Sequence, residues 1–144
     1  MMNVPRGTET VGGENVSSHF AREEAMHITL LHLENFRNYA TLTLSPHPGI
    51  NMILGQNGAG KTNLLEAIHY CALGRSHRVA SDRTVIHYDA PAGACGVTLQ
   101  TRMGREQVAV RLTPEAPRKK QVLLNRKPVP RLSDMMGRLQ CVIF

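Results

Sequence analysis

The sequence contains no tryptophan and few aromatic residues of any kind, which argues against one class of binding protein. Its aromatic side chains are three tyrosines and three phenylalanines. Proteins that hold single-stranded nucleic acid by its bases stack those bases on aromatic rings, so a stacking surface is poorly supplied here. Any contact with nucleic acid should therefore rest mainly on basic side chains that meet phosphate groups.

Cysteine is also scarce, and its spacing excludes two common structural devices. The three cysteines are Cys71, Cys95 and Cys141, an odd number of widely separated residues with no CxxC pair. Neither a disulfide framework nor a zinc site is indicated, and we expect each thiol to pack as a small apolar side chain. The seven histidines show no HExxH or similar ligand spacing.

Long apolar runs are absent as well. None approaches the roughly 20 residues that a membrane-spanning helix needs. Residues 1–25 have neither the apolar centre of a signal peptide nor the Arg-rich, acid-poor character of a transit peptide. We therefore expect a cytoplasmic protein with no membrane partner. Residues 1–25 are polar and without a period, which predicts a disordered leader or a misassigned start before a folded part at residues 26–144.

The charge of the chain is unevenly distributed. The whole sequence carries a formal net charge of +6, but residues 1–25 hold four acidic and two basic side chains. Residues 26–144 hold fifteen Lys and Arg against seven Asp and Glu, a net of +8. Such an excess suits a polyanion, either a nucleotide, a nucleic acid or an acidic membrane surface. A solvated basic surface without a partner gives the same composition.

Hydrophobic periodicity predicts an α/β fold built on one sheet. Apolar alternation or short apolar runs predict strands in "HITLLHLENFRNY", "ATLTLS", "INMIL", "CGVTLQT", "QVAVRL", "QVLL" and "QCVIF". "INMIL" is almost wholly apolar, which is typical of a strand buried on both faces of a sheet. Leu64, Leu65, Ile68, Cys71 and Ala72 form one stripe of a helix that follows "INMIL".

Between that predicted strand and helix lies a pattern that binds phosphate. "GQNGAGKT" fits GxxxxGK(S/T), the Walker A or P-loop pattern, and consists of Gly55, Gln56, Asn57, Gly58, Ala59, Gly60, Lys61 and Thr62. A loop that turns into a helix gathers backbone N–H groups at the positive end of the helix dipole. The glycines let the main chain approach phosphate, Lys61 reaches it as a point charge, and the Thr62 hydroxyl is placed to bind Mg²⁺. The alternative is a Gly-rich turn that carries Lys-Thr by chance.

The segments around this loop make the pattern more specific. "NFRNY", "GQNGAGKTNLLEAIHY", "GRSHR", "GREQVAV" and "RLSDMMGRLQCVIF" resemble, in order and spacing, the RecF family of bacterial DNA replication and repair proteins. The resemblance covers residues 26–144. It implies the N-terminal part of an ABC-type, SMC-like P-loop ATPase head, with a mixed β-sheet, a phosphate-loop helix and β-hairpins.

The resemblance also implies partners and site residues. RecF-like proteins bind ATP and DNA and dimerise around ATP. They act with RecR and RecO at single-strand gaps and at junctions with duplex. Residues 55–62 match the family's ATP site, and Arg37 matches an arginine that reaches the nucleotide phosphates in related heads, with Asn38 beside it. A solvated turn residue is the alternative interpretation of Arg37.

The sequence departs from the family pattern in two places. ABC-type ATPases need an apolar strand that ends in Asp-Glu, to hold Mg²⁺ and polarise water, and an LSGGQ-like segment that closes on the partner's nucleotide. Neither is present, so we expect an incomplete head with no catalytic residue, weak ATP binding and no turnover. An SMC- or SbcC-type head and a P-loop small-molecule kinase are the alternatives, and a non-enzymatic interaction module is a third.

Basic residues supply the candidate DNA contacts. They form one group after the predicted helix and one near residue 119: Arg75, Arg78, Arg83, Arg118, Lys119 and Lys120. Contacts of this kind predict affinity that falls steeply with salt and depends little on base sequence. For any single residue, a solvated surface position is the alternative.

Overall fold

The computed structural model describes residues 26–115 and 119–144, so the leader expected at residues 1–25 lies outside the described part. Six strands form one sheet in the order β2-β1-β3-β4-β5-β6, and every neighbouring pair is antiparallel. The strands are β1 (His27–Phe36), β2 (Tyr39–Leu44), β3 (Gly93–Thr101), β4 (Gly104–Leu112), β5 (Lys120–Leu124) and β6 (Lys127–Val129). The expected mixed sheet is therefore antiparallel throughout these residues.

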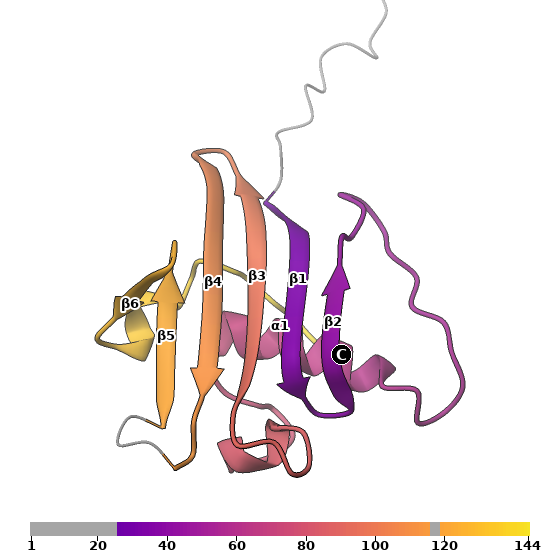
Figure 1. The fold of residues 1–144 in the computed structure, drawn as a ribbon. Helices are drawn as coiled ribbons and strands as arrows, with labels where there is room; N and C mark the ends of the chain where they lie inside the picture. Colours follow the sequence, from indigo (N-terminus) through magenta and orange to yellow (C-terminus); the bar gives the residue numbers. More distant parts are fainter. Residues whose placement is uncertain (1–25, 116–118) are drawn as a thin grey trace, which may run out of the picture.

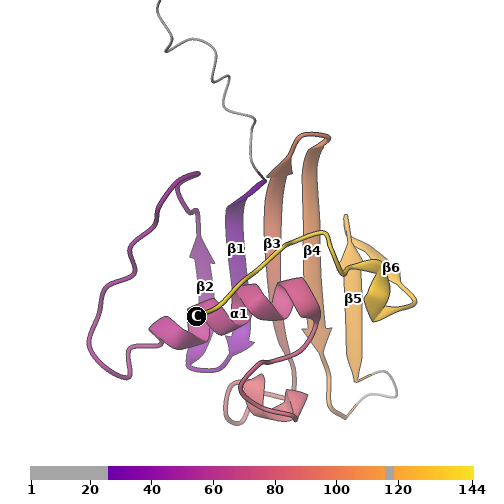
Figure 2. The ribbon, with the colours of Figure 1, turned by 180° about the vertical axis from the view of Figure 1, so that it is seen from behind.

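One face of the sheet carries the other elements. Helix α1 (Lys61–Leu73) lies across the strands on that face, which is the near side in Figure 2 and the far side in Figure 1. Of two short 3-10 helices, η2 (Asp82–Val85) lies past the ends of the strands and η3 (Leu132–Asp134) lies beside β5 and β6 (Figures 1 and 2). Among the described residues, no helix covers the opposite face.

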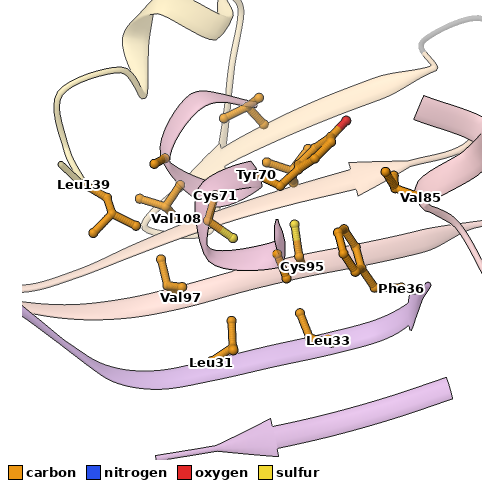
Figure 3. Packing of buried hydrophobic residues seen from close by; sticks show 14 of the residues in the cluster. Leu31, Leu33, Phe36, Tyr70, Cys71, Val85, Cys95, Val97, Val108 and Leu139 are labelled. Atoms are coloured by element: carbon orange, nitrogen blue, oxygen red, sulfur yellow. The ribbon is translucent and has the colours of Figure 1, made fainter. Parts of the chain in front are cut away.

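Strand register gathers the apolar side chains of the sheet beneath α1. Cys95 lies opposite Leu33 on one neighbouring strand and Val110 on the other, and Val97 lies between Leu31 and Val108. Successive residues of a strand point to opposite faces, so these rows share the face toward the helix. Figure 3 shows them packed together, and all are at most 3% exposed.

Helix α1 packs one of its sides against this core. Its buried apolar residues are Leu64, Ala67, Tyr70, Cys71 and Ala72, whereas Leu65 of the predicted stripe is 45% exposed. The Tyr70 ring meets Phe36 edge to face, with ring centroids 6.0 Å apart. The predicted burial of Cys71 and Cys95 as small apolar residues is thus confirmed (Figure 3).

Gly74 ends the helix in the left-handed conformation at φ 66°, and its N–H donates to the Tyr70 carbonyl at 2.7 Å. A Cβ at this position would lie 2.1 Å from a methyl group of Leu132. Glycine is therefore required here for two reasons: the left-handed backbone and the close packing of this position against Leu132 in η3.

The predicted strand "INMIL" is wrong. Residues 50–54 form no ladder, and Ile50, Met52 and Leu54 are 96%, 79% and 80% exposed. A strand in the interior of a sheet pairs with another strand along each of its edges. Here β2, the nearest edge strand, pairs only with β1 within the described residues. In Figures 1 and 2 this segment swings wide of the sheet on its way from β2 to α1.

The same correction applies to "QCVIF". Residues 140–144 make no ladder but run across the α1 side of the sheet, where the chain ends close to the helix (Figure 2). Val142 and Phe144 are exposed. Hydrophobic pattern alone identified both segments as strands, but a strand exists only where another strand offers hydrogen bonds.

We predict that residues 50–54 drive self-association of the 144-residue chain, because contiguous exposed apolar side chains with unpaired backbone promote aggregation. Replacing Ile50, Met52 and Leu54 together by Ser should raise the monomeric fraction measured by gel filtration with light scattering. Met103→Ser, at an equally exposed methionine in the β3–β4 turn, is the matched control and should change little. A triple variant that aggregates as readily as the wild type would show that this segment is not responsible.

Candidate phosphate-binding site

The loop of residues 55–60 leads directly into the N-terminus of α1. The N-cap residue Gly60 has φ 100°, no side chain caps the helix, and no acidic residue lies in its first turn. The first amides of a helix have no acceptor within it, so those of Lys61, Thr62 and Asn63 remain available. Uncapped amides at the positive end of the helix dipole form a natural anion site.

A hollow of about 340 Å³ lies at this helix terminus. It is lined by Asn57, Gly58, Gly60, Lys61, Thr62, Asn63 and Arg78. Five of the eight predicted loop residues are in that set, whereas Gly55, Gln56 and Ala59 belong to the loop without lining the hollow. The Lys61 ammonium lies across the loop and donates to the carbonyls of Gly55 at 2.6 Å and Gln56 at 2.7 Å. Its charge is therefore held at the mouth of the hollow.

The turn between β1 and β2 supports the loop from the side. Asn38 donates to the Ala59 carbonyl at 3.3 Å, and the Tyr39 hydroxyl donates to the Gly60 carbonyl at 3.1 Å. Asn63 on α1 donates back to the Asn38 side chain at 2.8 Å. The structure thus brings Asn38 to the loop, as the sequence suggested. Sequence analysis missed Tyr39, although its place beside Asn38 in "NFRNY" was the available signal.

Arg37 lies at the same end of β1, but its guanidinium points to a carboxylate. Its Nε donates to Glu66 at 2.9 Å, its Nη2 to the same carboxylate at 2.6 Å, and its Nη1 to the Thr84 carbonyl at 2.7 Å. Two of its five N–H donors remain, so a phosphate contact by Arg37 stays a prediction.

Glu66 is the buried centre of this polar cluster, and sequence analysis did not identify it. Besides Arg37, its carboxylate accepts from the Ser76 hydroxyl at 2.5 Å and from Arg78 Nη1 at 3.1 Å. Burial alone raises the pKa of Glu66. The hydrogen bonds from Arg37 and Ser76, with the charges of both arginines, outweigh that effect, so its pKa lies below the ordinary value. Glu66 is therefore ionised at neutral pH.

A second hollow of about 700 Å³ adjoins the first and shares Asn63 with it. Its lining combines residues of the β1–β2 turn with the segment around η2: Arg37, Asn38, Asn63, Arg83, Thr84, Ile86, His87 and Tyr88. No local pattern in residues 83–88 predicted this wall. A bridge between Phe36 and Ile86 holds the wall against β1, a long-range contact that no local pattern predicts.

The six predicted DNA contacts divide into four groups, of which Lys120 is the last. Arg75, Arg83 and Lys119 are exposed, and no ion pair ties their side chains to another described residue. Arg78 belongs to the cluster around Glu66. Arg118 lies outside the described residues.

Lys120 is held inside the fold. Its ammonium pairs with Asp82 at 2.8 Å, donates to the Gly74 carbonyl at 2.7 Å and lies 5.3 Å from the centre of the Tyr70 ring. The Tyr70 hydroxyl also donates to Asp82, and burial together with that bond raises the pKa of Tyr70. Lys120 thus ties β5 to the end of α1 and is less available to DNA than its position in a basic cluster suggested.

Two further kinds of site are absent from the part of the chain that the structure describes. No group of three or more His, Cys, Asp or Glu side chains is placed to hold a metal ion there. Within the same residues, α1 and the shorter helices all lack the length and apolar character needed to cross a membrane.

A substitution at Gly60 tests how closely the β1–β2 turn approaches the loop of residues 55–60. A Cβ at Gly60 would lie 2.6 Å from the Asn38 amide and 2.9 Å from the Tyr39 hydroxyl, and φ 100° strains any other residue. We expect Gly60→Ala to lower the free energy of unfolding by about 1–3 kcal/mol, because Asn38 and Tyr39 can move only by losing their hydrogen bonds to the loop. Gly58→Ala is the matched control, since Gly58 has φ 85° but no other atom would lie within 4 Å of its new methyl group. Equal losses in urea denaturation would contradict the steric explanation.

Comparison with known proteins agrees with this geometry. A family model described as an AAA domain matches residues 30–131. The DNA replication and repair protein RecF of Acetivibrio thermocellus is 37% identical over 119 residues, which are 83% of this chain and 32% of that protein. The chain therefore spans about a third of the length of this relative.

Solved structures give the same result. A structure described as the recombination mediator protein RecF-ATP in the RecFOR pathway superposes with a TM-score of 0.76 at 25% identity, covering 83% of this chain and 32% of that one. The SMC head domain from Thermotoga maritima superposes with a TM-score of 0.64 at 21% identity, covering 78% and 42%, a likeness of fold alone. The expected ATPase-head fold is confirmed. The chain belongs to the AAA domain family, and over the residues that match it is RecF-like.

Proposed function

We propose that this chain binds ATP through the loop of residues 55–62, as part of a RecF-type ATPase head that serves DNA replication and repair. The observation that carries the proposal is the uncapped N-terminus of α1, which opens into a hollow lined by Lys61 and Thr62. That arrangement meets the needs of a polyphosphate tail, namely several converging N–H donors and one side-chain cation.

The two hollows suggest how the nucleotide divides between them. The phosphates occupy the first hollow, where the amides of the first turn and the Lys61 ammonium donate to their oxygens. The nucleoside occupies the second, which Asn63 joins to the first and in which Ile86 and Tyr88 offer apolar and aromatic surface. A RecF homologue has been described with ATP, which supports the choice of nucleotide.

Thr62 fits the role expected of it toward Mg²⁺. Its exposed hydroxyl lines the first hollow beside Lys61, and Mg²⁺ at such sites takes one or two protein oxygens with phosphate oxygens and water as the rest. A bound Mg²⁺ would neutralise phosphate charge. Thr62 would supply one ligand, and the amides of the α1 terminus would orient the phosphate oxygens around it.

We further propose that the 144-residue chain binds ATP without turning it over. The first hollow has no carboxylate in its described lining, and Glu66 contacts its wall only through a hydrogen bond from Arg78. It is buried and accepts hydrogen bonds from two arginines and a serine, so it is not free to take a proton from water.

Replacement of Lys61 by Ala tests the ATP site. The substitution removes the ammonium at the mouth of the hollow, so we expect ATP affinity to fall at least about tenfold, as is typical when a charged hydrogen bond to an anion is removed. Equilibrium dialysis with labelled ATP and Mg²⁺ measures it, and Lys127→Ala, an exposed lysine on β6, is the control. Wild-type chain that retains no ATP would remove the basis of the proposal.

The role in DNA repair rests on relatives and on surface charge. The relatives are named for DNA replication and repair, and one is described in the RecFOR pathway. We propose that the intact protein dimerises with ATP and acts with RecO- and RecR-type partners at single-strand gaps and junctions with duplex. In this chain, Arg75, Arg83 and Lys119 are the candidate contacts that are exposed and have no ion pair with another described residue.

Salt dependence distinguishes these contacts from a solvated basic surface. Replacing Arg75 and Arg83 together by Ala should weaken binding to gapped DNA and lower the slope of log affinity against log salt by roughly two, one for each phosphate group that no longer meets an arginine. Arg105→Ala, an exposed arginine on β4, is the matched control. A slope that is unchanged in fluorescence anisotropy titrations would place the DNA elsewhere.

A further inference from the structure

The buried carboxylate of Glu66 underlies both hollows without lining either of them. Its side chain is fully buried, yet it pairs with Arg37 from the end of β1 and with Arg78 from the connector after α1. Arg37 lines the second hollow and Arg78 lines the first. One carboxylate thus connects an arginine at each of two adjoining hollows.

Glu66 binds only some of the N–H donors of Arg78, and the remaining donors can face a ligand. Arg78 spends the two hydrogens of Nη1 on Glu66, at 3.1 Å, and on Asn63, at 2.8 Å. Its Nε and Nη2 groups, three N–H donors in all, have no partner among the described residues. The Arg78 side chain is 42% exposed and lines the first hollow.

The planar geometry of a guanidinium explains what its binding to a carboxylate achieves. Arginine side chains are long and lose considerable rotational entropy when they are held in place. A carboxylate that binds one edge of a planar guanidinium fixes the direction of the other edge. Two guanidinium groups this close would otherwise repel each other and turn toward solvent.

We propose that Glu66 is a positioning residue for the nucleotide. It fixes one arginine at the phosphate hollow and one at the adjoining hollow, so that a nucleoside triphosphate lying across both meets two oriented cations. Glu66 carries one negative charge against the two positive charges of Arg37 and Arg78, so the cluster keeps a net charge of +1 that attracts phosphate. The inference rests on the proposed ATP site and deepens it.

The test compares Glu66→Gln with Glu34→Gln, the same substitution at an exposed carboxylate on β1. Gln keeps the shape but removes the charge that holds the arginines. The affinity for Mg-ATP is measured by calorimetry at a temperature where circular dichroism shows each variant folded. We expect Glu66→Gln to lower the affinity roughly tenfold, comparable with the effect of removing residues that orient the ligands of a metal ion, and Glu34→Gln to match wild type.

A double-mutant cycle separates positioning from a merely structural role. If Glu66 acts through Arg78, then Glu66→Gln should cost clearly less affinity in an Arg78→Ala background than in wild type. Should Glu66→Gln fail to fold, Glu66→Asp keeps the charge but withdraws the carboxylate by one methylene, and should lower affinity at least about threefold.

The possible outcomes are distinct. Folded Glu66→Gln, or Glu66→Asp in its place, that binds Mg-ATP as tightly as wild type overturns the inference and leaves the ATP site standing. Additive losses in the cycle overturn the action through Arg78. Wild-type protein that does not bind Mg-ATP overturns the ATP site and the inference together.

Discussion

The packing of one side of α1 onto the sheet is the constraint on which the other features depend. Tyr70 and Cys71 bury that side against Phe36 and Cys95, and this fixes the axis of the helix across the strands. A helix with a fixed axis has a fixed N-terminus, and here that terminus opens toward the β1–β2 turn. The hydrophobic core thereby fixes the direction of the available amides of the first turn, and it reaches the site itself through Ile86, which lines the second hollow.

Polar contacts then hold the loop and the charged side chains near the N-terminus of α1 in place. The turn after β1 holds the loop through Asn38 and Tyr39, and Arg37 in the same turn binds Glu66 on α1. The connector after α1 returns Ser76 and Arg78 to that carboxylate. Three segments distant in sequence therefore meet at one ionised group, and the burial of that group is tolerated because each of its oxygens accepts hydrogen bonds from two donors.

The lysines and arginines of the chain have two roles, in ion pairs and on the surface, which composition alone does not distinguish. Lys120 and Arg78 pair with the carboxylates of Asp82 and Glu66, whereas no ion pair ties Arg75 or Arg83 to another described residue. A count of lysines and arginines treats all four alike. Since a buried ion pair neutralises charge locally, the surface field is set by the residues that remain unpaired.

The sequence by itself determined the glycine-rich loop before α1, the helix behind it and the paired strands, because each depends on local spacing: glycines where torsions are unusual, and apolar residues at the helical or the alternating period. It also determined membership of the RecF-like group, through motifs in a fixed order. Tertiary structure alone decided that residues 50–54 form no strand, that Glu66 collects two arginines, and that Ile86 and Tyr88 wall a second hollow beside Asn63. These features depend on which distant segments come together, and hydrogen bonds and ion pairs need a partner that local periodicity does not specify.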